Sequence, residues 1–289
     1  MKPLPRWFRA FVRVGGTVSP RFMTFLTYRM FWNLGEPMAV RPEATSVHAR
    51  ARRETMTIGE RRVVVYRWGN GPDTVLLVHG WRGRGSQYAA IVEALESPER
   101  TIITFDAPGN GDSPGHQTDL RDYLAVIHAI ATEANGLTLL VGHSFGVMSI
   151  FVAVREGARA TRIVSIAGTS DMDYTYGTFA RALQLPSRVN TLLRRRIERR
   201  AFAGDTGIWR RFVSELDPTD QTPLLLIHDR DDRAVEFSQA EKIATAHLGP
   251  ITEVYTSGLG HTRVLSDPVV LRAIVDFASE PARTRSAAE

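Results

Sequence analysis

Short apolar runs alternate with longer amphipathic stretches from residue 52 onward. Runs rich in Val, Ile and Leu, such as TVLLVHG at 74–80 and PLLLIHD at 223–229, are typical of strands covered on both faces. The stretches between them, such as LRDYLAVIHAIATEA at 120–134, place apolar residues at helical spacing. These repeated strand, helix, strand units predict an α/β fold with a mostly parallel, twisted sheet flanked by helices. A hairpin that turns near Gly59 and Glu60 precedes them.

The alternation stops between residues 171 and 221. Two apolar stripes at helical spacing occupy this segment: Val189, Leu193 and Ile197 in the first, and Trp209, Phe212, Val213 and Leu216 in the second. We therefore expect the segment to be wholly helical. An insertion between two parallel strands emerges where strand ends and loops gather, which is where ligands bind in open α/β sheets. The segment is interpreted as a lid.

These patterns divide the chain into four parts. Residues 1–50 form an N-terminal helical, amphipathic segment, and residues 51–170 together with 222–280 form the α/β core. Residues 171–221 are the helical lid, and residues 281–289 are expected to be a flexible tail.

Arginine recurs in the N-terminal segment and in the lid. In the first segment Arg6, Arg9, Arg13, Arg21 and Arg29 interrupt the apolar runs, so neither a signal peptide nor a span of roughly 18 apolar residues is expected. Its short helices either pack on their own domain or lie at a membrane surface. The lid arginines at 194–196 and 199–200 are the solvated face of a helix, or they contact an anionic substrate or membrane.

Composition narrows the classes of protein. The chain has 289 residues, 43% of them hydrophobic, which is enough for one large domain with a substantial core. It has no cysteine, which excludes disulfides, a thiol nucleophile and a Cys-based zinc site, and is compatible with a cytoplasmic location, with or without membrane association. The net charge is +5, but the arginines are spread along the chain and no nucleic-acid motif is present. Oligomeric state is not readable from the sequence.

One serine stands between two glycines where a strand should become a helix. The stretch LLVGHSFGVMSI at 139–150 places Ser144 at this turn, where glycines avoid clashes that bulky neighbours would make. The turn would lift the hydroxyl above the sheet. It would also place the amide N–H of Phe145 at a helix N-terminus, aimed at a forming oxyanion. The pattern indicates nucleophilic catalysis, and the competing interpretation is a structural serine in a tight turn.

From this motif the chain resembles the α/β-hydrolase family, in particular its serine esterases and lipases, over about residues 60–280. HGWRGRGSQ after the early strand is similar to the family's oxyanion loop, which implies that the amide of Trp81 is the second oxyanion donor. FDAPGNGDSPG is similar to a further family stretch, although Asn110 stands where histidine is usual. Families of this fold with an aspartate nucleophile do not fit Ser144.

The resemblance also implies the base and the acid. His261, in SGLGHTRVL after the last predicted strand, stands where the family's base lies, and Gly258 and Gly260 allow its loop to bend. His79 and His143 are explained by backbone geometry, and the other histidines lie outside suitable strand ends. The family's acid maps to Asp232, with Asp231 the next candidate and Asp229 at a usual glycine. The last two are expected to be solvated or paired with neighbouring arginines.

These residues predict a serine hydrolase that cleaves carboxylic esters through an acyl-enzyme intermediate. The order Ser144, Asp232, His261 is that of the family, and no metal or organic cofactor is needed. The expected partner is a small ester or acyl substrate. The same triad would serve a thioesterase, an amidase, a C–C hydrolase or an acyltransferase. A binding module or a peripheral membrane protein on a hydrolase scaffold is the alternative from another class.

Two further sets of residues have open roles. Arg82 and Arg84, beside the predicted oxyanion loop, either lie on the surface or hold a substrate carboxylate. Aromatic residues of the lid form its core or a wall of the substrate pocket, namely Tyr174, Tyr176, Phe179, Trp209 and Phe212.

Overall fold

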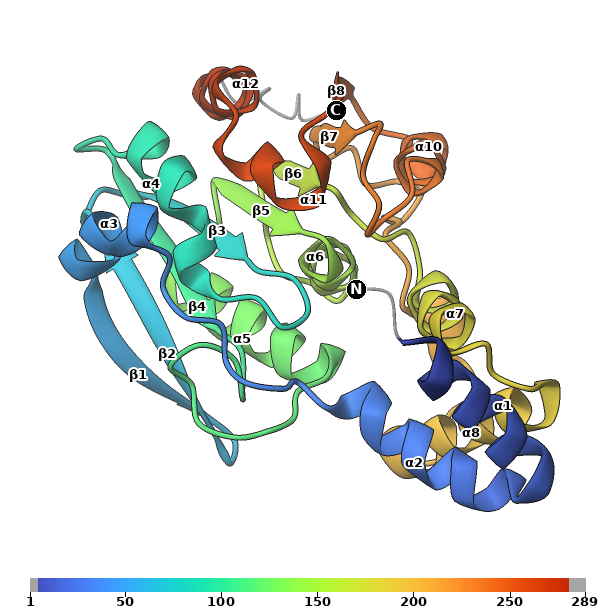
Figure 1. Cartoon of the computed structure of the whole chain (residues 1–289). Helices are drawn as coiled ribbons and strands as arrows, with labels where there is room; N and C mark the ends of the chain where they lie inside the picture. The colour runs from blue at the N-terminus through green and yellow to red at the C-terminus, as the bar shows by residue number, and fades with distance from the viewer. Residues whose placement is uncertain (1–4, 281–289) are drawn as a thin grey trace.

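The computed structural model describes residues 5–280, and it forms a single twisted sheet with helices on both faces (Figure 1). The predicted tail at 281–289 and the first four residues of the predicted N-terminal segment lie outside the described residues. The predicted α/β class with a mostly parallel sheet is confirmed.

Eight strands form the sheet in the order β1-β2-β4-β3-β5-β6-β7-β8. They are β1 Arg52–Ile58, β2 Arg61–Trp68, β3 Asp73–Val78, β4 Arg100–Asp106, β5 Leu139–His143, β6 Ile163–Ile166, β7 Leu224–Asp229 and β8 Ile251–Thr256. The pairs β1–β2 and β2–β4 are antiparallel, and all other neighbouring pairs are parallel. The predicted hairpin is confirmed, because Ile58 pairs with Arg61 across the turn.

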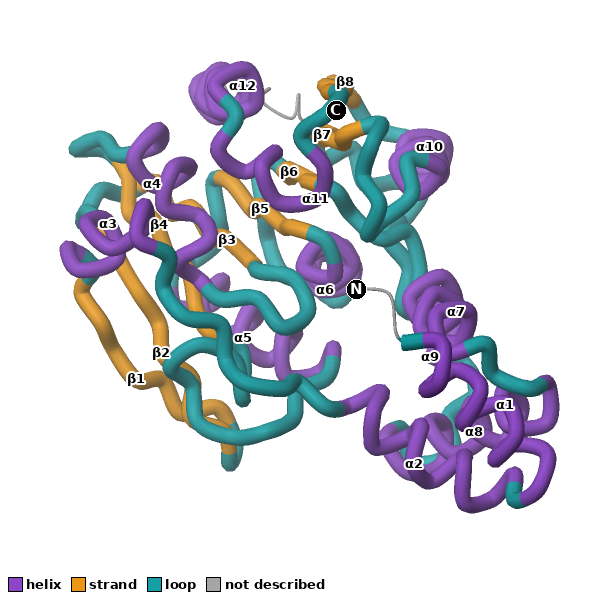
Figure 2. The backbone as a smooth tube through the Cα atoms, viewed as in Figure 1, coloured by secondary structure: helices purple, strands orange, loops and turns teal. Residues whose placement is uncertain are grey.

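Helices occupy the connections and the N-terminal segment (Figure 2). The α-helices are α1 Arg6–Val18, α2 Pro20–Trp32, α3 Thr45–Arg50, α4 Ala89–Leu95, α5 Leu120–Glu133, α6 Phe145–Arg155, α7 Met172–Leu183, α8 Ser187–Ala201, α9 Ile208–Arg211, α10 Ser238–Ala246, α11 Gly260–Arg263 and α12 Pro268–Ser279. The 3-10 helices are η1 Pro42–Ala44, η2 Gly85–Tyr88 and η3 Val264–Ser266. Asp267 caps α12 by accepting from the amides of Val269 and Val270.

Each face of the sheet has its own hydrophobic core, because successive side chains of a strand point to opposite faces. In β3, Leu76 and Val78 belong to the core that α5 and α6 cover, whereas Val75 and Leu77 belong to the core that α4 and α12 cover. All four side chains are almost fully buried. A strand that is covered on both faces reads as a continuous apolar run, which is why the sequence predicted these strands.

The segment at 171–221, called the insertion below, lies between β6 and β7 and contains α7, α8 and α9. The first predicted stripe is helical, and Val189, Leu193 and Ile197 are fully buried. The second prediction was wrong, because α9 ends at Arg211 and the residues after it are not helical. The chain turns instead to pair with the start of the insertion, where the amide of Met172 donates to Phe212 and that of Ser214 donates to Ser170. These backbone bonds replace the helical ones that the spacing predicted.

The N-terminal helices α1 and α2 pack against α8 and not against the sheet (Figure 1). Val12 and Met23 form a small core with Leu183 and Val189 of the insertion. Within residues 5–280, none of the helices has the length and apolar character of a membrane span.

Candidate active site

Ser144 lies on a sharp turn between β5 and α6, with a φ of 57° and a ψ of −121°. A positive φ is strained for a residue other than glycine, and such strain is concentrated at functional sites. The flanking glycines are required by close packing. A Cβ on Gly142 would lie 2.8 Å from the Cα of Val147, and one on Gly146 would lie 2.2 Å from the carbonyl oxygen of Val78. The motif therefore has this form because α6 begins directly against β3 and β5.

The loop at 79–84 packs against Ser144 through Gly80. A Cβ on Gly80 would lie 2.9 Å from the Cβ of Ser144 and 3.4 Å from its hydroxyl oxygen. Trp81 follows at the next position, and its ring lies 5.5 Å from that of Phe145. Phe145 is the first residue of α6, so its amide is one of those that an α-helix leaves without an internal acceptor. Trp81 and Phe145 are thus both beside the serine.

The imidazole of His79 ties this loop to the end of β4. Its Nε2 accepts the amide hydrogen of Ala107 at 3.0 Å, so its Nδ1 carries the proton and donates to the carbonyl of Gly80 at 2.7 Å. His79 is fully buried, and burial lowers its pKa and keeps the ring neutral. The expectation that backbone geometry alone explains His79 was therefore incomplete, because its ring holds two hydrogen bonds.

His261 and Asp232 form a close pair. The histidine lies on the short helix α11, and its Nδ1 donates to Oδ2 of Asp232 at 2.7 Å. Asp232 is 7% exposed and also accepts from the amides of Ala234 and Val235. Burial alone would raise the pKa of Asp232, but the hydrogen bond and charge of His261 and the two amides outweigh it, so the pKa is lowered. The carboxylate therefore stays ionised and orients the imidazole.

Asp229 and Asp231 both accept hydrogen bonds from the backbone of the histidine loop. Asp231 is exposed to solvent, as expected, whereas Asp229 is buried and is neither solvated nor paired with an arginine. Asp229 is fully buried, and its Oδ2 accepts from the hydroxyl of Thr256 at 2.7 Å and from the amide of Leu259 at 3.0 Å. Asp231 accepts from the amide of Gly258 at 2.8 Å. Burial would raise the pKa of Asp229, but these donors outweigh it and the pKa is lowered. In the sequence, the run of aspartates in HDRDD was the signal that could have indicated this role.

His143 links the serine turn to the histidine loop, a contact that sequence reasoning missed. Its Nε2 donates to the carbonyl oxygen of His261 at 2.8 Å, and the two rings lie 4.6 Å apart. Burial, reinforced by the neighbouring His261, lowers the pKa of His143 to about 3. A neutral His143 thus holds the backbone of His261 against the residue that precedes Ser144. Within residues 5–280, neither the Ser144 hydroxyl nor Nε2 of His261 has a hydrogen-bond partner.

Arg84 is buried in a polar network behind the loop. Its guanidinium donates to Asp112 at 3.1 Å and to the carbonyl of Met38 at 2.8 Å, and lies 3.7 Å from Asp106. Asp106 in turn accepts from the amide of Gly85 at 2.7 Å. This corrects the expectation that Arg84 lies on the surface or holds a substrate carboxylate, whereas Arg82 is exposed as the surface interpretation requires.

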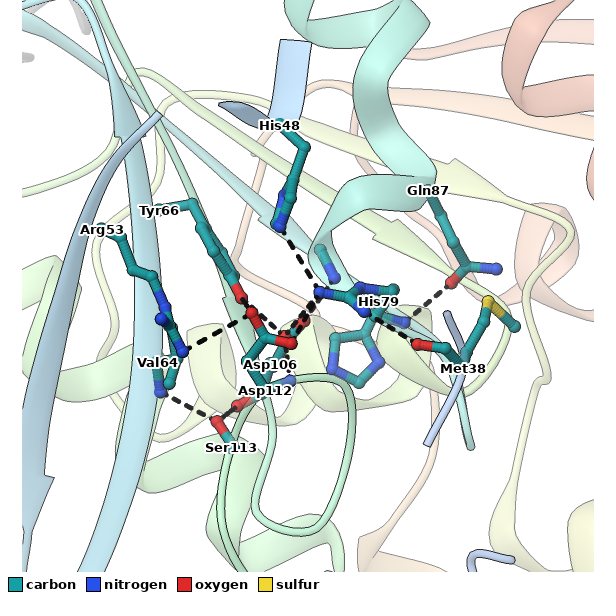
Figure 3. Close-up of polar contacts among 12 residues, drawn as sticks. Met38, His48, Arg53, Val64, Tyr66, His79, Gln87, Asp106, Asp112 and Ser113 are labelled. Atoms are coloured by element: carbon teal, nitrogen blue, oxygen red, sulfur yellow. Dashed lines mark hydrogen bonds and ion pairs between the residues drawn. The ribbon is translucent and has the colours of Figure 1, made fainter. Parts of the chain in front are cut away.

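The same network fixes the stretch FDAPGNGDSPG. Tyr66 donates to both Asp106 and Asp112 at 2.9 Å, as Figure 3 shows. Burial alone would raise the pKa of Asp112, but Tyr66 and Arg84 outweigh it and lower the pKa. Asn110, which stands at the family's usual histidine, is buried and donates to the carbonyl of Pro108 at 3.1 Å. The loop is therefore held by its own polar contacts despite this departure.

Aromatic side chains surround the loop at 79–84 and the insertion. The ring of Trp81 lies 6.4 Å from that of Trp32, the last residue of α2. Of the aromatic residues predicted in the insertion, Tyr176, Trp209 and Phe212 are buried, and Tyr174 and Phe179 are half-buried. The three buried residues form the core of the insertion, which was one of the two interpretations left open by the sequence.

A hollow of about 1120 Å³ lies at the opposite edge of the sheet from Ser144. It is lined by residues at the starts of β5 to β8, among them Thr138, Arg162 and Pro223. It contains none of the predicted site residues. No group of three or more His, Cys, Asp or Glu side chains in residues 5–280 is arranged to hold a metal ion.

Comparisons with known proteins agree with this geometry. Residues 75–274 match a family model described as the alpha/beta hydrolase family. A pimeloyl-[acyl-carrier protein] methyl ester esterase of Vibrio atlanticus is 32% identical over 103 residues, which are 35% of this chain and 38% of that protein. A pyrethroid hydrolase of Sphingobium wenxiniae is 34% identical over 82 residues, 26% of this chain and 28% of that protein.

Among solved structures, the mouse alpha/beta hydrolase domain-containing protein 10 is similar with a TM-score of 0.60. It is 16% identical, and the match covers 78% of this chain and 96% of that one, which shows a shared fold. The curated matches span only 38% and 28% of those relatives, but the family model covers more than half of this chain. The protein therefore belongs to the alpha/beta hydrolase family.

Proposed function

We propose that the protein is a serine hydrolase that cleaves carboxylic esters through an acyl-enzyme intermediate. Ser144 is the nucleophile, His261 the base and Asp232 the acid. The observation that carries the proposal is the hydrogen bond of 2.7 Å between His261 and the buried carboxylate of Asp232. His143 joins the loop that holds His261 to the strained serine turn. Catalytic hydrogen bonds are often long before substrate binds, so the serine and the imidazole are expected to meet in the substrate complex.

In the first step the hydroxyl oxygen of Ser144 attacks the ester carbonyl, and Nε2 of His261 takes the hydroxyl proton. The same proton then passes to the leaving alcohol as the C–O bond breaks. Asp232 holds the Nδ1–H tautomer and stabilises the imidazolium. In the second step His261 takes a proton from water, which attacks the acyl-enzyme. As the bond between the acyl carbon and the Ser144 oxygen breaks, His261 returns that proton to the serine oxygen, which releases the acid and free Ser144. A positioned base of this kind contributes about 10²- to 10⁴-fold in rate.

The amides of Trp81 and Phe145 would hold the oxyanion of the tetrahedral intermediate. Gly80 lies against Ser144, which supports placing the following amide at the reaction centre, and Phe145 begins α6. One such donor is worth about 3 kcal/mol of the activation barrier. In this proposal no metal or cofactor takes part.

The insertion is proposed to act as the lid over this site. It follows β6, whose carboxyl end lies beside that of β5 in the sheet, and it packs with α2, whose Trp32 contacts Trp81. Phe31 of α2 lies 5.2 Å from Phe179 of α7, so the lid and the N-terminal helices form one aromatic wall.

Carboxylic esters are the substrate class favoured by the curated relatives, one of which is a methyl ester esterase. Thioester, amide and carbon–carbon hydrolysis would differ in the leaving group, and acyl transfer would differ in the acceptor, with the same three side chains. Rates on p-nitrophenyl esters and on acyl thioesters of matched chain length would separate ester hydrolysis from thioester hydrolysis. They would also report the size of the acyl pocket.

Covalent labelling tests the nucleophile. The wild-type protein should react with a fluorophosphonate probe and hydrolyse p-nitrophenyl esters, and Ser144→Ala should lose both by at least about 10³-fold. Ser149→Ala is the matched control, because Ser149 lies one turn further along α6 with its hydroxyl bonded to the carbonyl of Phe145. It should keep both activities. Labelling that persists in Ser144→Ala, or a folded wild type that neither labels nor hydrolyses esters, would refute the proposal.

A further inference from the structure

A row of large apolar side chains on α1 and α2 faces solvent. Across residues 5–280, eight large hydrophobic residues are exposed, and six of them lie between residues 7 and 25. The six are Trp7, Phe11, Val14, Val18, Phe22 and Phe25. Trp7 is 71% exposed and Val18 is 79% exposed. A monomeric protein rarely concentrates its exposed apolar residues in this way unless the surface binds something.

Most of the exposed row lies on one face of α1, and a second face of the same helix is packed against the protein. Residues 7, 11, 14 and 18 follow helical spacing along α1. On the adjacent face Val12 is fully buried, and a Cβ on Gly16 would lie 2.8 Å from Pro186 at the start of α8. Since α1 is already fixed through this second face, the exposed row is not required to attach the helix to the insertion.

The charge around this face has one sign. Residues 5–35 contain five arginines, Arg6, Arg9, Arg13, Arg21 and Arg29, and no Asp or Glu. Four of them are exposed and Arg9 is half-buried, and none of the five forms an ion pair with any residue of the described chain. The neighbouring helix α8 adds six arginines and one glutamate. Arg29 and Arg196 both lie over the ring of Phe25, at 5.8 and 5.5 Å from its centre.

We propose that this face of α1 and α2 docks the protein on the surface of an anionic lipid bilayer. The aromatic and valine side chains would enter the boundary between headgroups and acyl chains, and the arginines would meet lipid phosphates. Tryptophan and phenylalanine on one side with arginine on another is the pattern of helices that lie in this interface. A second copy of this chain is a poorer occupant, because two such arginine-rich faces would repel each other.

Docking would place the candidate site beside the membrane. The last residue of α2, Trp32, contacts Trp81, which follows the glycine that packs on Ser144. Figure 1 shows α1, α2 and α8 grouped on one side of the sheet. Membrane binding itself is independent of the ester hydrolysis proposed above, and it is measured with the full-length Ser144→Ala protein so that no lipid can be hydrolysed.

Vesicle co-sedimentation tests the apolar half of the proposal. Full-length protein should bind vesicles of mixed phosphatidylglycerol and phosphatidylcholine. The variant Trp7→Ser/Phe11→Ser/Val18→Ser should reduce the partition coefficient at least about tenfold, since each buried side chain contributes on the order of 1.5–3 kcal/mol. The matched control is Leu248→Ser/Val269→Ser, because these are the two large hydrophobic residues of the described range 5–280 that are exposed outside the face, at 61% and 65% exposure. It should bind as the parent protein does.

A separate variant tests the electrostatic part of the membrane-binding proposal. Changing Arg6, Arg9 and Arg13 to glutamine should weaken binding to the mixed vesicles about fivefold per charge, equivalent to about 1 kcal/mol each. Binding should also fall on phosphatidylcholine vesicles and in about 1 M salt, where the screening length is about 3 Å. Circular dichroism and hydrolysis of a water-soluble ester, in the wild-type Ser144 background, report whether each variant is folded.

Three results would overturn the proposal. The first is a folded parent protein that stays in solution with the mixed vesicles. The second is equal loss of binding in the Leu248/Val269 control. The third is a dimer in size-exclusion chromatography that the Trp7/Phe11/Val18 variant converts to a monomer, because a second copy would then cover this face.

Discussion

At the scale of single residues, the three aspartates at 229, 231 and 232 have different hydrogen-bonding partners. Asp232 accepts from the imidazole of His261, whereas Asp229 and Asp231 accept from backbone or hydroxyl groups of the strand and loop that carry it. The difference arises from where the turn after β7 directs each carboxylate. Only a carboxylate in contact with the imidazole can hold its tautomer and stabilise its positive charge.

The pair Asp232→Asn and Asp231→Asn tests this division. In Asp232→Asn the amide cannot hold the Nδ1–H tautomer, so kcat for a p-nitrophenyl ester should fall about 10⁴-fold. In Asp231→Asn the side-chain oxygen can still accept from Gly258, so kcat should change less than about tenfold. The reverse order of effects in steady-state kinetics would move the acid to Asp231.

At the scale of elements, the loop at 79–84 is positioned by contacts from both sides. Gly80 meets the serine turn, and Arg84 joins the loop to β4, to the stretch after β4 and to the chain after α2 through Asp106, Asp112 and Met38. A buried guanidinium is costly unless its partners are present. The network therefore makes the position of the loop depend on three separate segments.

Arg84→Met should destabilise the protein, whereas Arg82→Met should not. Removing Arg84 leaves the buried Asp106 without its cation and leaves Asp112 with Arg53 alone, which is expected to cost about 3–5 kcal/mol in the free energy of unfolding. Arg82 is exposed, so its replacement should change that free energy by about 0.5 kcal/mol or less. Urea denaturation followed by circular dichroism compares the two, and equal costs would contradict the structural role of Arg84.

At the scale of the whole molecule, buried imidazoles couple stability to pH. Burial lowers the pKa values of His79, His143 and His228, that of His143 to about 3. These groups bind a proton in the unfolded chain near their ordinary pKa but stay neutral in the fold. The free energy of unfolding therefore falls as pH drops through about 6.5 towards the folded values. Below about 4 the lowered pKa values of Asp229 and Asp232 add a further loss.

His143 should account for a measurable share of this dependence. Between pH 7.5 and pH 5 it should remove about 2 kcal/mol from the free energy of unfolding, because the unfolded imidazole gains a proton that the folded one does not. The difference between the two pH values should therefore be smaller by about that amount in His143→Asn. Urea denaturation at both pH values checks it, whatever the variant loses at pH 7.5. An unchanged difference would show that His143 titrates alike in both states.

Much of the fold was predictable because its signals are local. Runs such as those of β3 and β7 indicate strands covered on both faces, and GHSFG marks a strand-to-helix turn wherever it packs. In the stripe from Trp209 to Leu216 the same kind of signal failed, since spacing cannot show that the backbone after Arg211 bonds to the start of the insertion. The candidate site residues could be proposed from their order and motif positions, because parallel strands end at one edge of the sheet.

By itself, then, the sequence determined the α/β class, the helical, amphipathic N-terminal segment and the turn that carries Ser144, since periodicity and glycine placement act over a few residues. Tertiary structure decided which aspartate meets His261, that Arg84 is buried while Arg82 is not, and which face of α1 stays exposed. Those outcomes depend on partners that lie 29 to 46 residues away along the chain or in another element. Side-chain spacing indicates only that a face is apolar and does not show which neighbour covers it.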